Sequence, residues 1–155
     1  MATQLSEHFT LEELCHSDVA LRAGIDNSTT DPSIVASLTD LAIHILEPIR
    51  RQFNIPFSPT SGYRCLALNT LIKGAANSQH MVGKAADIVL PTVTRPQLAE
   101  WIRVNLDFDQ LILEYYSPGQ PDSGWVHCSY NTGNNRKQVL TYQPGSAGPV
   151  DGLQP

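Results

Sequence analysis

The chain has 155 residues, 41% of them hydrophobic, and carries a formal net charge of −5 at pH 7. This length and composition fit a single folded domain and exclude an intrinsically disordered chain. The acidic balance argues against a protein that binds nucleic acid or an anionic membrane through bulk charge, and no apolar stretch reaches the roughly 18 residues of a membrane-spanning helix.

The N-terminal part of the sequence predicts short helices. Thr10 and Glu13 have the spacing of a capping box, in which each side chain bonds the other's backbone N–H at the start of a helix. A second short helix is expected after Ser17, and Gly24 is positioned to end it. Both helices are therefore predicted from their end residues.

The longest predicted helix covers residues 32–52. Asp31 is a good N-cap, and Pro32 takes the first helical position, where its missing N–H has no consequence. The apolar residues recur at steps of three and four, which indicates one apolar face. They are Ile34, Leu38, Leu41, Ile45 and Ile49. Pro48 lies inside this pattern and is expected to bend or loosen the last turn.

The remaining elements are mostly strands. The predicted strands cover residues 55–60, 85–90, 108–115, 124–130 and 137–142, and two further helices cover 66–73 and 95–105. Residues 75–84 are polar and contain glycine, which predicts a loop. Because helices come mainly first and strands mainly later, we expect an α+β fold with an antiparallel sheet and helices packed on one side.

The two ends of the sequence have different features. The first residues lack the basic start and apolar segment of a signal peptide. Residues 143–155 contain three Gly, three Pro and little that could be buried, so we expect a Gly/Pro-rich disordered tail after a domain that spans 1–142.

Three cysteines, Cys15, Cys65 and Cys128, are odd in number and widely spaced. This pattern does not suit a disulfide scaffold. We expect free thiols in a reducing cytosol.

Residues that could bind a metal ion occur in three places. His80 lies in the polar loop and Asp87 follows seven positions later in a predicted strand, and a turn at Gly83 would bring both side chains to one point. His127 lies on a later strand, and Glu114 ends the strand before it. Two histidines and one carboxylate suffice for a catalytic zinc site, which uses three protein ligands and keeps a fourth position open.

Each of these residues also has an ordinary structural interpretation. A histidine on a strand is more often satisfied by hydrogen bonds than by a metal, and Glu114 could be a charge at a strand end. Cys128 is a rival soft ligand, but strand alternation turns it away from its neighbour His127. The other histidines, His8, His16 and His44, have no partner at ligand spacing. The two tryptophans, Trp101 and Trp125, are expected in the core.

Three motifs in the sequence carry a family resemblance. They are Ser78-x-His80-x-x-Gly83-x-Ala85-x-Asp87, Trp125-Val-His127, and Ser61-Gly-Tyr-Arg64 followed by Asn69. With most of the chain, they resemble the zinc-dependent D-alanyl-D-alanine carboxypeptidases and L-alanyl-D-glutamate endopeptidases, whose fold is shared with the hedgehog signalling domain. The resemblance is greatest to the small phage and prophage branch.

The resemblance implies roles for individual residues. It implies that Zn²⁺ is bound by His80, Asp87 and His127. It further implies that Arg64 holds a carboxylate or carbonyl oxygen of the substrate, since a guanidinium is always charged and forks onto carboxylates. Ser78 and Gln79 would add hydrogen bonds to the peptide.

The chain departs from the family pattern at the catalytic acid. Many relatives carry an Asp or Glu three residues before the last zinc histidine, where this chain has Gly124. The phage branch is similar to this sequence in its Asp-Gln-x-Ile-x-Glu strand, which makes Glu114 the expected catalytic residue. Asp122 is the candidate in reserve.

The implied function is a zinc metallopeptidase that hydrolyses peptidoglycan stem peptides, as a D-Ala-D-Ala carboxypeptidase or an L-Ala-D-Glu endopeptidase. A phage or prophage endolysin of this kind would be a monomer made in the host cytoplasm that acts on the cell wall or periplasm after release. One alternative is a catalytically inactive zinc-binding domain that serves as a phage structural or binding component. Another is a general intracellular dipeptidase. An acid aimed at the metal argues against the first alternative, and an open groove argues against the second.

Overall fold

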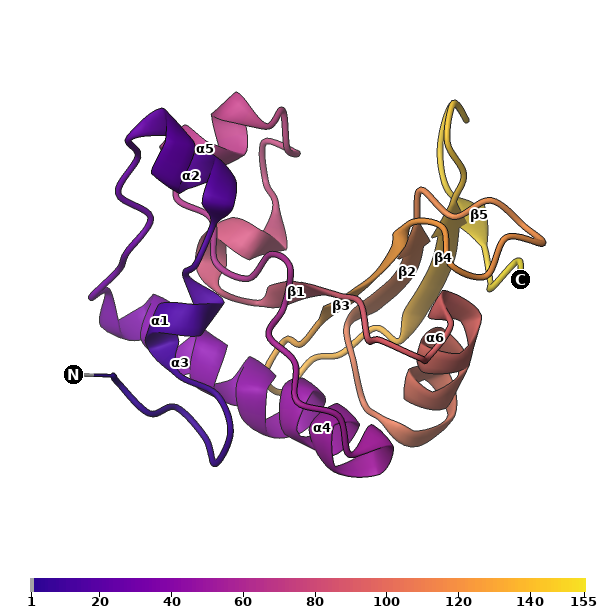
Figure 1. Ribbon diagram of the computed structural model, residues 1–155, viewed down its shortest axis with the longest axis horizontal. Helices are drawn as coiled ribbons and strands as arrows, with labels where there is room; N and C mark the ends of the chain where they lie inside the picture. The colour runs from indigo at the N-terminus through magenta and orange to yellow at the C-terminus, as the bar shows by residue number, and fades with distance from the viewer. Residues whose placement is uncertain (1) are drawn as a thin grey trace.

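The computed structural model describes residues 2–155 and consists of helices packed against one five-stranded sheet (Figure 1). The helical segments are α1 (Leu11–Leu14), α2 (Asp18–Ala23), α3 (Pro32–Leu41), the π-helical turn η1 (Ala42–Leu46), α4 (Glu47–Phe53), α5 (Leu66–Leu71), the 3₁₀ turn η2 (Gln79–Val82) and α6 (Arg95–Asn105). The strands are β1 (Ala85–Ile88), β2 (Gln110–Glu114), β3 (Trp125–Ser129), β4 (Gln138–Tyr142) and β5 (Val150–Asp151). The predicted α+β class is confirmed.

The strands lie in the order β1-β3-β2-β4-β5, and every neighbouring pair is antiparallel except β2 and β4, which are parallel. The sheet is therefore mostly antiparallel, as expected, with β2 and β4 as its one parallel pair. The reason is topological: β3 returns antiparallel beside β2, and β4 reverses again but lands on the other side of β2, so β2 and β4 run in the same direction.

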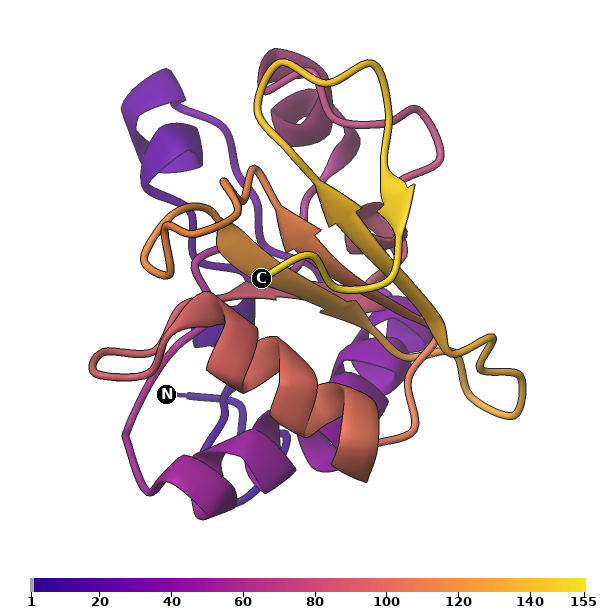
Figure 2. The same cartoon turned by 90° about the vertical axis from the view of Figure 1, so that its right-hand side faces the viewer.

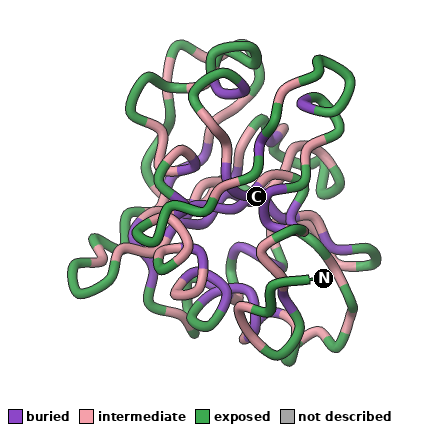
Figure 3. Tube along the Cα trace, turned by 90° about the vertical axis from the view of Figure 1, so that its left-hand side faces the viewer, coloured by how far each residue is buried: buried purple, intermediate pink, exposed green. Residues whose placement is uncertain are grey.

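One face of the sheet forms the core, and the other carries polar side chains. Leu111, Leu113, Val126 and Cys128 are fully buried on the first face, which packs against α6. Figure 2 shows α3, α4 and α6 beneath the sheet and α5 above it. Figure 3 shows the buried residues concentrated toward the middle of the molecule, with exposed segments around them.

The predicted helix over 32–52 forms, but it is interrupted. The N–H of Glu47 donates to the carbonyl of Ala42, five residues back, which makes residues 42–46 a π-helical turn. Pro48 follows directly and has no N–H to donate, so a regular α-helical ladder cannot pass through it. The loosening expected from Pro48 is thus found one turn earlier than predicted.

The strand predicted over 55–60 does not form. Pro56 and Pro59 lack the N–H groups that a sheet ladder needs. In this region only Ser61 makes a bridge to Asp87, and the N–H of Thr60 donates to the carbonyl of Asp87 at 2.9 Å. This contact fastens residues 60–61 beside β1.

Composition predicts a disordered tail over 143–155, whereas the structure places this segment back along the outer edge of β4. There β5 pairs with Leu140 and Thr141, and the Thr141 hydroxyl donates to the carbonyl of Gly152 at 2.8 Å. The boundary at residue 142 stays a prediction.

Two further expectations are confirmed within residues 2–155: the cysteines are unpaired, and no helix is suited to cross a membrane. Cys15, Cys65 and Cys128 are all unpaired, and Cys128 points into the core, away from His127. No helix in the described part of the chain combines the length and apolar character needed to cross a bilayer.

Candidate metal centre

A short turn delivers His80 to the polar face of the sheet. The Ser78 hydroxyl accepts from the N–H of His80 at 3.2 Å and caps η2. Gly83 ends η2 at φ +76°, and a Cβ there would lie 2.8 Å from the carbonyl of Ile34 on α3. Only glycine suits this close approach, so Gly83 turns the chain from η2 into β1 as the sequence predicted.

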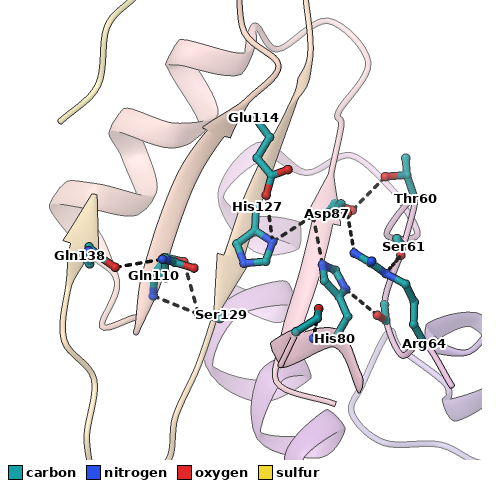
Figure 4. A network of polar contacts seen from close by, with 12 residues as sticks. Thr60, Ser61, Arg64, His80, Asp87, Gln110, Glu114, His127, Ser129 and Gln138 are labelled. Atoms are coloured by element: carbon teal, nitrogen blue, oxygen red, sulfur yellow. Dashed lines mark hydrogen bonds and ion pairs between the residues drawn. The ribbon is translucent and has the colours of Figure 1, made fainter. Parts of the chain in front are cut away.

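Strand pairing brings the other two candidate ligands together. Asp87 on β1 lies directly opposite His127 on β3 in the register. Asp87 Oδ1 lies 3.2 Å from His127 Nδ1 and 3.4 Å from His80 Nε2 (Figure 4). All three side chains are buried, and their nearest donor atoms lie within 4.8 Å of one another.

This arrangement fits a zinc ion. Nitrogen and oxygen ligands at about 2.0 to 2.2 Å in a tetrahedron lie about 3.3 to 3.6 Å from each other, close to the two separations from Asp87 Oδ1. His80 Nδ1 lies 2.7 Å from the carbonyl of Gly62 and donates to it, which leaves Nε2 as the unprotonated nitrogen. His80 Nε2 is buried, and within the described residues it has no hydrogen-bond partner. Leaving a buried polar atom unpaired costs free energy, and binding a metal ion would remove that cost.

Glu114 lies beside this cluster. Its Oε1 is 3.6 Å from His127 Nδ1, and its side chain points from the end of β2 toward the three ligands (Figure 4). Burial raises the pKa of the Glu114 carboxyl, and the charge of Asp87 acts in the same direction. The charges of His127 and Arg64 lower this pKa, but the net effect is a raised value. A desolvated carboxyl with a raised pKa suits a group that takes and returns a proton.

Asp122, the reserve candidate, is far more exposed. Its side chain is 86% accessible, in the loop between β2 and β3, with a carboxylate oxygen 4.0 Å from Arg95 Nη1. Gly124 adopts φ +63°, and a Cβ there would lie 2.0 Å from the carbonyl oxygen of Glu114. An acid at position 124 is thus incompatible with this hairpin, and the structure places Glu114 at the cluster instead.

Arg64 lies against the cluster. Its position just before α5 would also suit a charged residue on the surface, but its side chain is mostly buried. Its Nε donates to the Ser61 hydroxyl at 3.2 Å, its Nη1 donates to Asn69 Oδ1 at 3.0 Å, and its Nη2 lies 3.8 Å from Asp87 Oδ2. Gly74 packs so close that a Cβ there would lie 2.1 Å from Asn69 Oδ1. The guanidinium is therefore held from three sides.

The two residues expected to bind peptide, Ser78 and Gln79, both line the groove and both already have intramolecular partners. The Ser78 hydroxyl caps η2, and Gln79 Nε2 donates to Asp109 Oδ2 at 2.8 Å. The sequence did not reveal this role of Asp109, because the two residues are 30 positions apart.

The cluster opens into a groove of about 840 Å³ on the polar face of the sheet. Its walls come from β1, β2 and β3, from Ser61, Arg64 and Arg136, and from residues 72–75 and 77–80. Tyr115 stacks on Trp125 with ring centroids 5.2 Å apart, and both line the groove. Trp125 was expected in the core, but the alternation that places His127 on the polar face places Trp125 there as well.

The sequence is similar to a known protein family over most of its length. A sequence profile of the family described as Peptidase M15 matches residues 7–129, which include the three candidate ligands, Arg64 and Glu114. A search of curated proteins found no match.

Proposed function

Because the chain belongs to the peptidase M15 family and is a metallopeptidase, we propose that it is a zinc enzyme that hydrolyses the stem peptides of peptidoglycan. The observation that carries the proposal is the convergence of His80, Asp87 and His127 beside Glu114 in one groove. Three ligands and one free carboxyl are the parts that metal-assisted amide hydrolysis requires.

When bound, a zinc ion activates water and polarises the scissile carbonyl. Glu114 takes the proton of the attacking water and delivers it to the leaving nitrogen, a transfer that its position 3.6 Å from His127 Nδ1 supports. Arg64 binds a carboxylate or carbonyl oxygen of the peptide next to the reacting bond. Ser61 and Asn69 orient Arg64, so little side-chain entropy is lost when the peptide binds.

The position of Glu114 favours an enzyme over an inactive zinc-binding domain. Burial of its carboxylate destabilises the fold, and a domain that serves only as a structural or binding component would gain nothing from a carboxylate at this position. The groove volume of about 840 Å³ lies in the upper part of the roughly 300 to 1,000 Å³ range of ligand sites, which suits several residues of a peptide better than a dipeptide.

We further propose that the protein is a phage or prophage endolysin, a monomer made in the host cytoplasm that reaches the wall after the membrane is breached. The resemblance of its motifs to the small phage branch supports this role. Expression in a bacterial host with and without a membrane-permeabilising protein tests it. Lysis only on co-expression is expected, and lysis in neither case would contradict the role.

Digestion of purified peptidoglycan followed by mass spectrometry of the muropeptides tests the activity. Loss of a terminal D-Ala would show carboxypeptidase activity, and separation of L-Ala from D-Glu would show endopeptidase activity. The His80→Ala variant and chelator-treated enzyme should give neither product, whereas Asp122→Asn should match the wild type. Unchanged muropeptides with zinc-loaded wild type would contradict the proposal.

A further inference from the structure

A buried carboxylate holds an arginine and a glutamine at the end of β2 opposite Glu114. Asp109, only 2% exposed, immediately precedes β2. It accepts from Arg136 Nε at 2.9 Å, from Arg136 Nη2 at 2.8 Å and from the Arg136 backbone N–H at 3.0 Å. Gln79 Nε2 completes the set at 2.8 Å. Arg136 thus has one fixed orientation.

The pair is ionised and rigid. Hydrogen bonds from Arg136 lower the pKa of Asp109 to about 2, against the effect of burial. The Asp109 backbone is anchored as well, since its N–H donates to the carbonyl of Ser129 at 2.8 Å and its carbonyl accepts from Gln138 at 3.0 Å. A carboxylate bound in this way positions a guanidinium with little remaining freedom.

Arg136 keeps donors available for a ligand. Its side chain is 55% exposed and lines the groove. Within residues 2–155 its Nη1 makes no hydrogen bond, so one edge of the guanidinium is unused. Although the chain carries a net charge of −5, the groove is lined by three of its ten Lys and Arg residues. They are Arg64, Lys73 and Arg136.

The strand sets the distance between Arg136 and the metal centre. Ile112 lies opposite His127 in the β2–β3 register, three residues after Asp109. At about 3.3 Å per residue, the Asp109–Arg136 pair lies roughly 10 Å along β2 from the level of His127. An extended peptide in the groove has a similar rise, so a substrate group at Arg136 is about three residues from the bond at the metal centre.

We propose that Arg136 binds a free side carboxylate of the substrate peptide about three residues from the cleaved bond, with Asp109 as its positioning residue. In a stem peptide cut between its two terminal D-Ala residues, the α-carboxylate of D-Glu occupies that place, and the C-terminal carboxylate lies one residue beyond the bond, next to Arg64. The proposal rests on the proposed function and specifies which substrate the groove recognises. Arg136 lies outside residues 7–129, to which the family profile extends.

Two peptides that differ in one group test this subsite. One is L-Ala-γ-D-Glu-L-Lys-D-Ala-D-Ala, and the other carries an amide in place of the D-Glu α-carboxylate. Their dissociation constants are measured calorimetrically with the zinc-loaded Glu114→Gln protein, in which turnover does not interfere. The carboxylate form should bind about tenfold or more tightly than the amide, the scale of hydrogen bonds to a charged group.

A second set of variants separates binding from structure. Arg136→Gln in the same background should weaken binding of the carboxylate peptide to the level of the amide peptide and leave the amide peptide nearly unaffected. Asp109→Asn should reduce the preference, because Arg136 is then free to move. The matched control is Lys73→Gln, a groove cation that has no buried partner within residues 2–155, and this variant should keep the preference.

Equal or absent binding of the two peptides by the Glu114→Gln protein overturns the proposal. A preference that persists in Arg136→Gln, with both peptides weakened by the same factor, also overturns it and assigns Arg136 a structural role. These outcomes do not depend on hydrolysis, so a wild type that binds with the expected preference but cleaves neither peptide would contradict the proposed function alone.

Discussion

Glu114 Oε1 lies 3.6 Å from His127 Nδ1, although neither residue is the other's direct partner in the sheet. In the register Glu114 faces Trp125 and His127 faces Ile112, so the carboxylate reaches the histidine diagonally across the β2–β3 pair. This diagonal contact places an acid beside the candidate ligands without using the position of Gly124. If Glu114 has the proposed role, a carboxylate on the neighbouring strand takes the place of one on the histidine's own strand.

Replacement of Glu114 by Gln should abolish most of the activity. The amide is nearly the same size but cannot take a proton from water, so we expect a loss of at least ~100-fold in turnover, the scale of one general acid–base group. Zinc content and thermal stability should stay close to wild type, because no candidate ligand is changed. Turnover on stem peptide, with metal analysis of the same sample, measures both.

The matched control for this prediction is Asp122→Asn. Its side chain is 86% exposed and lies in a loop, so the change should leave turnover within about threefold of the wild type. If Asp122→Asn is inactive and Glu114→Gln is active, the two assignments are reversed. Full activity in both variants would mean that neither carboxylate assists the reaction.

The Gly124→Ala substitution should destabilise the protein through a backbone collision. Gly124 has φ +63°, and a Cβ there would lie 2.0 Å from the carbonyl oxygen of Glu114. We expect a loss of about 2 to 4 kcal/mol in the free energy of unfolding, measured in urea, together with lower activity because Glu114 must move.

Gly119→Ala in the same loop is the control for Gly124→Ala. Gly119 also has positive φ, +82°, but nothing lies within 4 Å of the added Cβ. It should lose only about 1 kcal/mol, the cost of the left-handed conformation itself. Equal losses in the two variants would show that the collision at Gly124 is relieved at no cost.

The parts of the fold that were predicted correctly depend on residues close together in sequence. Ser17 caps the start of α2 and the left-handed Gly24 ends it, both as expected, and the turn at Gly83 brings His80 to Asp87. Local hydrogen bonds and steric limits decide these features, so a short sequence window contains the information.

The parts that were missed depend on segments far apart in sequence. The parallel pairing of β2 with β4 depends on where the chain crosses the sheet, which no periodicity encodes. Arg136 and Asp109 are 27 positions apart, so no local sequence pattern links them. Asp109 begins the Asp-Gln-x-Ile-x-Glu motif and directly precedes a buried strand, but neither feature reveals which residue it binds.

Removal of the metal should leave the fold intact but lower its melting temperature. The hydrophobic core lies on the opposite face of the sheet from the three candidate ligands, so it does not need the metal to form. A ligand that binds only the folded state stabilises it by RT ln(1 + [L]/Kd), so the melting temperature should rise with free zinc concentration. One zinc per chain is expected by metal analysis, and none in His80→Ala.

His8→Ala serves as the control for zinc binding. Glu7, His8 and Glu47 form a second group of possible ligands, but Glu47 is already bonded to the Ser6 hydroxyl and to the N–H and Nδ1 of His8. Zinc stoichiometry should therefore stay at one in His8→Ala. A stoichiometry that falls in His8→Ala and not in His80→Ala would move the site to the N-terminal cluster.

The three thiols should differ in reactivity. Burial raises the pKa of Cys15 to about 11, with help from the charge of Glu12, and burial raises the pKa of Cys128 well above its ordinary value. In native protein an alkylating reagent should therefore modify the partly exposed Cys65 first. Peptide mapping identifies the site, and titration in denaturant without reductant should find three thiols. Prior modification of Cys128 would contradict its burial.

The ion pair of Asp109 and Arg136 should make a pH-dependent contribution to stability. The pKa of Asp109 is lowered from 3.8 to about 2 in the folded protein, chiefly by the Arg136 hydrogen bonds. A group with a lowered pKa stabilises the fold fully above its unfolded pKa and loses this contribution as the pH falls through the folded value.

The difference in unfolding free energy between wild type and Asp109→Asn should thus be constant above about pH 5 and shrink by at most about 2 kcal/mol between pH 4 and pH 2. Urea unfolding of both proteins without metal measures this difference, in which contributions common to the two proteins cancel. Arg136→Gln should show the same trend against wild type, since it removes the donors responsible for the shift. A difference that stays constant down to pH 2 would mean that Asp109 is not ionised by its contact with Arg136, and the fixed orientation of Arg136 in the groove would lose its physical basis.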